Sequence, residues 1–148
     1  MTTRVQTHPL ISIRAGAAVQ EAARLMVDCS IGAIGILDAQ HRFAGIVTER
    51  DLAWFVAQGR DAQATTAGEI VNDFPVVVDG PIDDASALER MRSARIRHLI
   101  VREEGNFRIV SIRDFISVLS GESEPITREV MTATRSGVSR RYVPVSGR

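Results

Sequence analysis

Several residue patterns are missing or scarce in this sequence. It has no lysine, a single cysteine and no apolar run near the roughly 20 residues that cross a bilayer. The lone Cys29 excludes an intrachain disulfide and a cysteine metal cluster, and its place at the end of an expected helix favours a small buried hydrophobe over a nucleophile. The opening residues also lack the apolar core of a secretory signal. We therefore expect a cytoplasmic protein without a membrane segment.

The sequence also lacks an excess of charge of either sign. Eighteen basic residues, all of them arginine, balance eighteen acidic ones. A duplex-binding protein usually carries a basic surplus, so we do not expect a nucleic-acid partner. Without lysine, any phosphate contact must come from arginine, histidine or backbone N–H groups. The local exception is residues 132–148, which carry arginines and no acid; we expect 122–148 to be a basic, flexible, solvated tail.

What is present is a repeat. The stretch Gly45–Asp51 (GIVTERD) recurs 63 positions later as Arg108–Asp114 (RIVSIRD). Met26–Leu37 lines up with Met91–Arg102 at an offset of 65, so the first copy has two extra residues within Asp38–Ala44. A turn tolerates such an insertion and a strand does not. Each copy covers about 50–55 residues, which is typical of a repeated supersecondary unit.

Hydrophobic periodicity places the elements. The first copy reads strand 10–13, helix 17–28, strand 34–37, strand 43–47 and helix 51–58. The second reads strand 76–78, helix 85–94, strand 99–101, strand 107–110 and helix 114–119. The predicted fold is therefore mixed α/β (α+β), with two β-α-β-β-α units at 5–58 and 67–121. Neither unit is large enough for a robust core alone, so we expect them to pack face to face as one body.

The helices have identifiable inner faces. Three-four spacing predicts that Val19, Ala22 and Met26 of the first helix are buried, with Leu88 and Met91 as their counterparts. In the helix 51–58 we expect Leu52, Phe55 and Val56 to face inward. We also expect Trp54 and Phe55, beside Leu119, to offer an apolar helical surface for a twofold homodimer, so both expectations involve Phe55.

The repeated residues resemble the CBS domain family. The likeness lies in Gly45–Asp51 after a hairpin, in Ile96–Val101 after the helix that carries Met91, and in the separating segment Thr66–Val71. Two such units in tandem resemble a Bateman module. The resemblance implies a pseudo-twofold pair whose central cleft has two related sites, often for AMP, ADP, ATP or S-adenosylmethionine. It also implies a disc-like dimer formed through helices.

Hydroxyl and carboxylate groups recur at equivalent strand-to-helix turns. Asp51 and Asp114 are suited to accept hydrogen bonds from ribose hydroxyls, or to cap the helices that they begin. Thr48 and Ser111 are suited to donate to ribose or phosphate, or to act as caps, which is the more common role of such residues. Their recurrence in register favours a ligand role for all four.

The basic candidates flank these turns. Arg50 and Arg113 are suited to bidentate phosphate contacts, or to ion pairs at a helix start, for example with Glu49. The resemblance places phosphate-contacting side chains at Arg97 and His98. His98 also fits a hydrogen-bonded structural role, and nothing at metal spacing accompanies it, so we predict no metal site.

The two copies differ in ways that predict unequal sites. The counterparts of Arg97 and His98 are Gly32 and Ala33, which carry no charge. Conversely, Arg108 replaces Gly45, where it would either obstruct the neighbouring space or turn outward. Neither Gly35 nor Ile100 matches the proline that is common in the family at that position, which is a mild departure.

Three functions compete: a stand-alone regulatory module that binds an adenosyl ligand and signals to another protein, a dimerisation module without a ligand, and an enzyme. We find no nucleophile–base pair, metal constellation or phosphate-binding glycine loop, so we predict no catalysis and no required cofactor. The effector protein remains unidentified. The segment 126–132 resembles one that leads into a further unit, and it would return along the edge of the module, reach a partner or stay loose.

Overall fold

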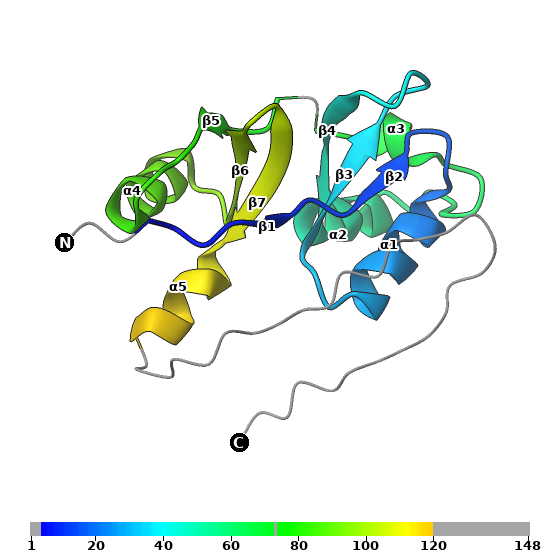
Figure 1. Ribbon diagram of the computed structural model, residues 1–148. Coiled ribbons are helices and arrows are strands. Elements are labelled where there is room, and N and C mark those ends of the chain that lie inside the picture. The colour runs from blue at the N-terminus through cyan, green and yellow to red at the C-terminus, as the bar shows by residue number, and fades with distance from the viewer. Residues whose placement is uncertain (1–3, 73, 120–148) are drawn as a thin grey trace.

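The computed structural model describes residues 4–72 and 74–119. They form two separate β-sheets that lie side by side (Figure 1). The first half comprises β2 (Ser12–Arg14), α1 (Val19–Asp28), β3 (Ala33–Leu37), β4 (Phe43–Thr48) and α2 (Glu49–Ala57). After α3 (Ala67–Ile70), the second half comprises β5 (Val77–Asp79), α4 (Asp84–Ala94), β6 (His98–Glu103), β7 (Asn106–Ser111) and α5 (Ile112–Leu119). The predicted mixed fold with two related β-α-β-β-α units is confirmed.

The repeat is visible in individual backbone hydrogen bonds. The N–H of Glu49 donates to the carbonyl of Gly32 over 3.0 Å, and the N–H of Ile112 donates to the carbonyl of Arg97 over 2.9 Å. Each bond ties the start of a helix to the residue before a central strand. The two halves therefore share one local geometry at the strand-to-helix turns where the candidate ligand residues lie.

Each half lends a segment to the other half's sheet. The sheet orders are β2-β3-β4 and β1-β7-β6-β5, where β1 is the short strand His8–Pro9. β1 precedes the first half, yet it pairs antiparallel with β7 of the second, as Figure 1 shows. In the reciprocal position, Asn72 precedes the second half and bridges to Ile46 in β4. These exchanged edges join the halves into one body.

The predicted strand 10–13 is wrong in its bounds for this reason. The chain leaves one sheet after Pro9 and enters the other at Ser12, so Leu10 and Ile11 cross between two sheets. α3 was also missed, although Thr66 and Glu69 form a capping box that the sequence displays. Ala67 of α3 is buried in the core of the first half.

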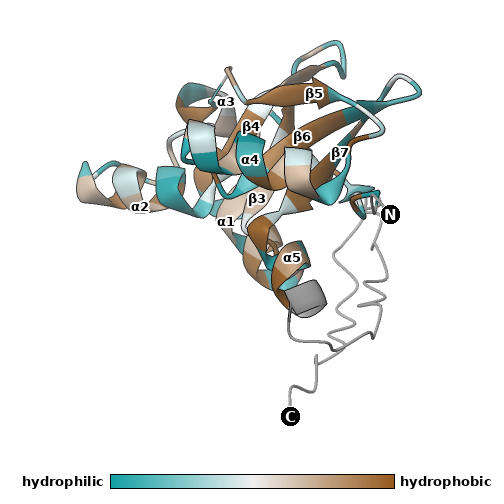
Figure 2. Ribbon diagram, turned by 90° about the vertical axis from the view of Figure 1, so that its left-hand side faces the viewer, coloured by the Kyte–Doolittle hydropathy of each residue, from teal (hydrophilic) through white to brown (hydrophobic). Residues whose placement is uncertain are grey.

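The core consists of two apolar clusters, one per half. Figure 2 shows the hydrophobic residues concentrated on the central strands, where β3 and β6 are buried. The predicted inner faces are confirmed: Val19, Ala22, Met26 and Met91 are buried, and Leu88 packs against the second cluster. The equivalent rings of Phe43 and Phe107 stack with centroids 4.3 Å apart, which links the two hairpins.

Two expectations about α2 need correction. Phe55 is 2% exposed, so it faces inward and is wrong as a surface residue, whereas Val56 is 73% exposed and is wrong as an inward one. The guanidinium of Arg60 covers the Phe55 ring at 5.4 Å, because the chain folds back over α2 after the helix ends. Trp54 is 69% exposed, as expected. The side chain of Leu119 and the tail 122–148 lie outside the described residues.

The two extra residues of the first hairpin lie where the sequence placed them. Ile36 pairs with Gly45 but Leu37 pairs with Phe43, so Ala44 is a bulge in β4. The turn takes the other extra residue.

Candidate anion site between the two halves

Four of the predicted ligand residues meet around one small cavity. Arg97, His98, Ser111 and Arg113 line it, together with Glu49 and Ile112. Its volume is about 30 Å³, which is room for a water-sized group and not for a nucleotide. The side chains of Arg97 and Arg113 belong to exposed residues, so both can swing away without breaking the core. Three potentially cationic side chains, those of Arg97, His98 and Arg113, therefore converge at this cavity.

His98 connects this site to the other half. A Cβ built on Gly32 would lie 3.1 Å from Nε2 of His98 and 3.1 Å from Oε2 of Glu49. The imidazole of the second half and the carboxylate of the first half therefore occupy the space beside Gly32. A side chain at position 32 would press on His98 and Glu49, which is consistent with a glycine as the counterpart of Arg97.

The surroundings of His98 disfavour its protonated form. Burial lowers the pKa of His98 below its usual 6.5, and the charges of Arg97 and Arg113 lower it further. Glu49 and Asp114 act in the opposite direction. The neutral imidazole is thus the resting form beside two arginines, and an added anion would reverse part of this balance.

Ser111 and His8 both contact Asp114. Its Oδ2 accepts a hydrogen bond of 2.7 Å from the backbone N–H of Ser111, and its Oδ1 lies 3.0 Å from Nε2 of His8 on β1. The backbone N–H of Arg113 donates to Oγ of Ser111 over 3.3 Å. The exchanged strand β1 therefore contacts the predicted ribose-binding carboxylate. No pattern in the sequence indicates His8, because its contact with Asp114 depends on the exchange of β1 between the halves.

Thr48 and Asp51 form a capping box at the start of α2. Oδ2 of Asp51 accepts from the N–H and the hydroxyl of Thr48, at 2.7 and 2.8 Å. The N–H of Asp51 donates back to Oγ1 of Thr48 over 3.3 Å. The capping role that the sequence left open is therefore present. Oδ1 of Asp51 accepts no hydrogen bond from any residue that the structure describes, and this oxygen remains available to a ligand.

The two remaining expectations concern arginines. Arg50 is exposed and forms no ion pair with Glu49 within the described residues; Glu49 turns instead toward His98 and Gly32. Arg108 turns toward the segment that precedes β1. Its Nε donates to Oγ1 of Thr7 over 2.7 Å, and Nη2 donates to the carbonyl of Thr7 over 2.9 Å. Arg108 thus fastens the segment that carries β1 and His8.

Comparison with known proteins identifies the architecture. The CBS domain family model matches residues 3–57. The CBS domain-containing protein YhcV of Bacillus subtilis (strain 168) is 35% identical over 129 residues, covering 83% of this chain and 85% of that protein. The chain belongs to the CBS domain family.

Solved structures of CBS proteins share the fold over both halves. A putative signal-transduction protein with CBS domains from Burkholderia ambifaria is 29% identical with a TM-score of 0.70, covering 81% of this chain and 89% of that one. A CBS domain protein from Pyrobaculum aerophilum complexed with AMP is 28% identical with a TM-score of 0.67, covering 75% of this chain and 88% of that one. This CBS chain therefore has the tandem arrangement of its structural relatives.

Other chemistries lack support in the described residues. No group of three or more His, Cys, Asp or Glu among them could hold a metal ion, and no helix among them is long and apolar enough to cross a membrane. Burial, followed by the charge of Asp28, raises the pKa of the half-buried Cys29 thiol. Cys29 is therefore a poor nucleophile, as its position in the sequence indicated.

Proposed function

We propose that this CBS pair binds an adenosine nucleotide between its halves and signals its occupancy to a partner protein. The observation that carries the proposal is the convergence of Arg97, His98, Ser111 and Arg113 on one cavity at the junction of the halves. The AMP complex of the Pyrobaculum aerophilum relative supports the ligand class. The chain itself then acts as a regulatory module and not as an enzyme.

The arrangement suits a phosphate better than a neutral ligand. Two guanidinium groups offer forked donors, the hydroxyl of Ser111 is a further donor, and protonation of His98 would add a third charge. A phosphate would meet Arg97 and Arg113 in a cavity that Glu49 also lines, so the two guanidinium groups must outweigh one carboxylate there. Asp114, at the start of α5, would accept the ribose hydroxyls. Movement of Arg97 and Arg113 would open the cavity to the nucleotide.

The two sites should differ in strength. The counterpart site at Thr48, Arg50 and Asp51 receives no cation from Gly32 or Ala33. We therefore propose one strong phosphate site per chain, with Asp114 as its ribose acceptor. Asp51 would hold the ribose in the weaker site.

Calorimetry with AMP, ADP, ATP, S-adenosylmethionine and adenosine tests the proposal. Arg97→Ala should weaken AMP binding about ten- to hundredfold, because a charged contact contributes about 1.5–3 kcal/mol. The affinity for adenosine, which lacks the phosphate, should fall much less on the same substitution. Arg92→Ala removes the same charge from an exposed site outside the cavity and should leave both affinities unchanged. Asp114→Asn keeps the shape of the side chain and should weaken the binding of AMP and of adenosine to the same extent.

Equal loss of AMP and adenosine on Arg97→Ala would mean that Arg97 supports the fold and not the phosphate. If the wild-type chain binds none of the five compounds at millimolar concentration, the second candidate function applies. That candidate is a dimerisation module, favoured by exposed apolar side chains on α1, α2 and α5: Val27, Trp54, Val56 and Ile116. We propose a homodimer in either case.

A further inference from the structure

The imidazole of His8 lies on the carboxylate that the proposed nucleotide needs for its ribose. Its Nε2 is 3.0 Å from Oδ1 of Asp114. An ionised carboxylate only accepts hydrogen bonds, so the Nε2–H group is the donor in this contact. The other oxygen, Oδ2, accepts from the backbone N–H of Ser111 over 2.7 Å. A ribose that approaches Asp114 therefore meets a carboxylate whose two oxygens already have donors from the same chain.

The backbone around His8 is fastened on both sides. Arg108 donates to the hydroxyl and to the carbonyl of Thr7, over 2.7 and 2.9 Å. Pro9 pairs with Arg108 in the ladder between β1 and β7. The side chain of His8 is nevertheless 31% exposed, so it has room to rotate into solvent. Rotation of the imidazole, without movement of the strand, would therefore release Asp114.

The reciprocal residue of the first half does not occupy the equivalent carboxylate. β1 and the bridge at Asn72 lie at reciprocal edges of the two sheets, so Asn72 is the counterpart of His8. Oδ1 of Asn72 accepts from the backbone N–H of Phe74 over 3.0 Å. Oδ1 of Asp51 has no hydrogen-bond donor within the part of the chain that the structure describes. The two candidate ribose acceptors therefore differ in how accessible they are to a ligand.

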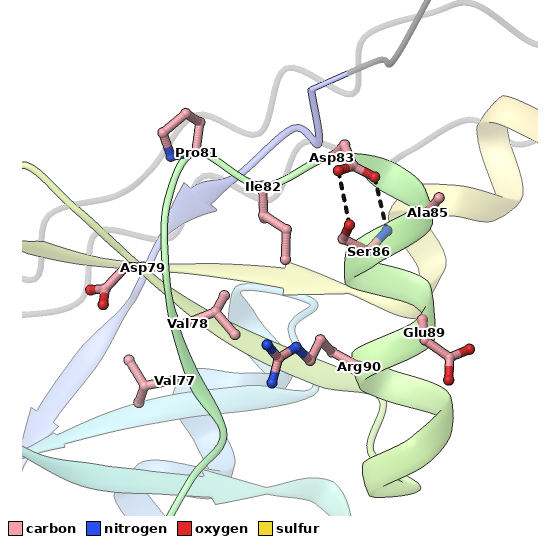
Figure 3. Close-up of a pocket in the computed structure, with 10 residues that line it drawn as sticks. All are labelled: Val77, Val78, Asp79, Pro81, Ile82, Asp83, Ala85, Ser86, Glu89 and Arg90. Carbon is pink, nitrogen blue, oxygen red and sulfur yellow. Dashed lines mark hydrogen bonds between the residues drawn. The ribbon is translucent and has the colours of Figure 1, made fainter.

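A larger groove elsewhere on the second half offers no better place for the nucleotide. It lies between β5 and α4, and its volume is about 800 Å³ (Figure 3). Three carboxylates and one arginine line it, and none of the predicted ligand residues is among the lining side chains. This balance of charge repels a phosphate. Asp51 and Asp114 therefore remain the candidates for the ribose.

We propose that His8 competes with the ribose for Asp114, an inference that rests on the proposed nucleotide site. In the empty site the imidazole donates to the carboxylate. A nucleotide reaches Asp114 only after the imidazole has rotated away and a ribose hydroxyl has taken its place. Breaking this contact lowers the measured affinity for every ligand that carries the hydroxyls. His8 thereby determines how much the ribose contributes to binding.

Calorimetry of the full-length chain with AMP and 2′,3′-dideoxy-AMP tests the competition. His8→Ala should strengthen AMP binding about three- to tenfold, because a hydrogen bond to a partly exposed carboxylate no longer has to be broken. The affinity for dideoxy-AMP, which has no ribose hydroxyl to place on Asp114, should stay unchanged. The bonds between Arg108 and Thr7 do not involve the imidazole, so the variant should retain β1. His41→Asn removes an exposed histidine from a turn and should leave both affinities unchanged.

Nitrogen NMR of the imidazole rings observes the displacement directly. The chemical shift of Nε2 of His8 should change when AMP is added and should change much less with dideoxy-AMP. Both ligands bring the same base and phosphate, so the difference between them isolates the ribose hydroxyls. The spectrum of His8→Ala assigns the signal. Equal shifts with the two ligands would contradict the competition.

The affinities separate this inference from the proposed function. If AMP binds His8→Ala no more tightly than wild type, the competition is overturned and the nucleotide site stands. If AMP and dideoxy-AMP gain equally on His8→Ala, the imidazole obstructs the entrance and not the ribose contact, which also overturns it. If neither chain binds AMP at millimolar concentration, the proposed function fails and this inference fails with it.

Discussion

Two glycines of the first half account for much of the difference between the halves. Gly32 stands where the second half has Arg97, because the imidazole of His98 and the carboxylate of Glu49 fill the space beside it. Gly45 stands where the second half has Arg108, and its φ of +152° is one that side-chain residues rarely adopt. Arg108 escapes this restriction and fastens Thr7. Both differences between the halves are visible in the sequence. Their causes are not, because they lie in contacts between the two halves.

Gly45 offers a test of this backbone constraint. A Cβ there would collide with the carbonyl oxygen of Asn72 and lie 2.8 Å from Cγ2 of Val71. We expect Gly45→Ala to lower the free energy of unfolding by at least about 2 kcal/mol, through strain and lost pairing with Asn72. Gly16→Ala is the matched control, because no atom lies within 4 Å of its Cβ position. Urea unfolding measures both, and an equally stable Gly45→Ala would contradict the constraint.

His98 makes stability depend on pH. Its pKa in the folded chain is lowered by burial and by Arg97, so between that pKa and about 6.5 the unfolded chain binds a proton that the folded chain does not. Stability from this residue is present above pH 6.5 and is lost as the pH falls through this window. We expect His98→Gln to lose less stability than wild type between pH 7.5 and 5.5.

The exposed His41 supplies the control for that comparison. His41→Asn removes a histidine from a turn, so its unfolding midpoint should follow the wild-type pH dependence. If His98→Gln and wild type lose the same free energy of unfolding between pH 7.5 and 5.5, another group causes the loss of stability at low pH.

At the scale of elements, the sequence predicted every helix of the described residues except α3, and it placed β3 to β7 within a few residues. Periodicity was sufficient for α1 and α4, since their buried residues recur at three- and four-residue intervals. It failed for β1 and β2, because Leu10 and Ile11 are apolar but cross between sheets. It also misassigned Val56, which no element among the described residues covers. Partners distant in sequence decide such cases.

The strand-to-helix turns allow a test of how much each hydroxyl contributes to capping the helix that follows. Thr48→Ala removes the hydroxyl of the α2 capping box, so we expect a loss of about 1 kcal/mol in the free energy of unfolding. Ser111→Ala should cost less, since Ser111 accepts only a long 3.3 Å bond from the Arg113 N–H. Chemical denaturation of both variants measures the difference. A larger loss from Ser111→Ala would show that the second turn depends on its hydroxyl more than these contacts indicate.

The candidate site shows what a repeat in the sequence can and cannot indicate. Recurrence in register identified Ser111, Arg113 and Asp114, and the family resemblance added Arg97 and His98. His8 and Glu49 were not identified, because both enter from elements that only the exchange of edges and the packing of halves bring close. The motif belongs to each half, whereas the contacts of His8 and Glu49 depend on both halves.

The exposed helices determine the last prediction at the scale of the whole molecule. Val27, Trp54, Val56 and Ile116 are each more than half exposed, and such apolar surface on a folded chain is typical of an interface. We expect a homodimer at micromolar concentration and at least about a tenfold weaker association for Trp54→Glu, whose charge would be buried against the second copy. Phe74→Glu changes an aromatic residue that is 86% exposed outside these helices, and it should leave the dimer intact. Light scattering after gel filtration measures both variants, and circular dichroism confirms that Trp54→Glu stays folded. A wild-type chain that is monomeric at this concentration would exclude the helical interface.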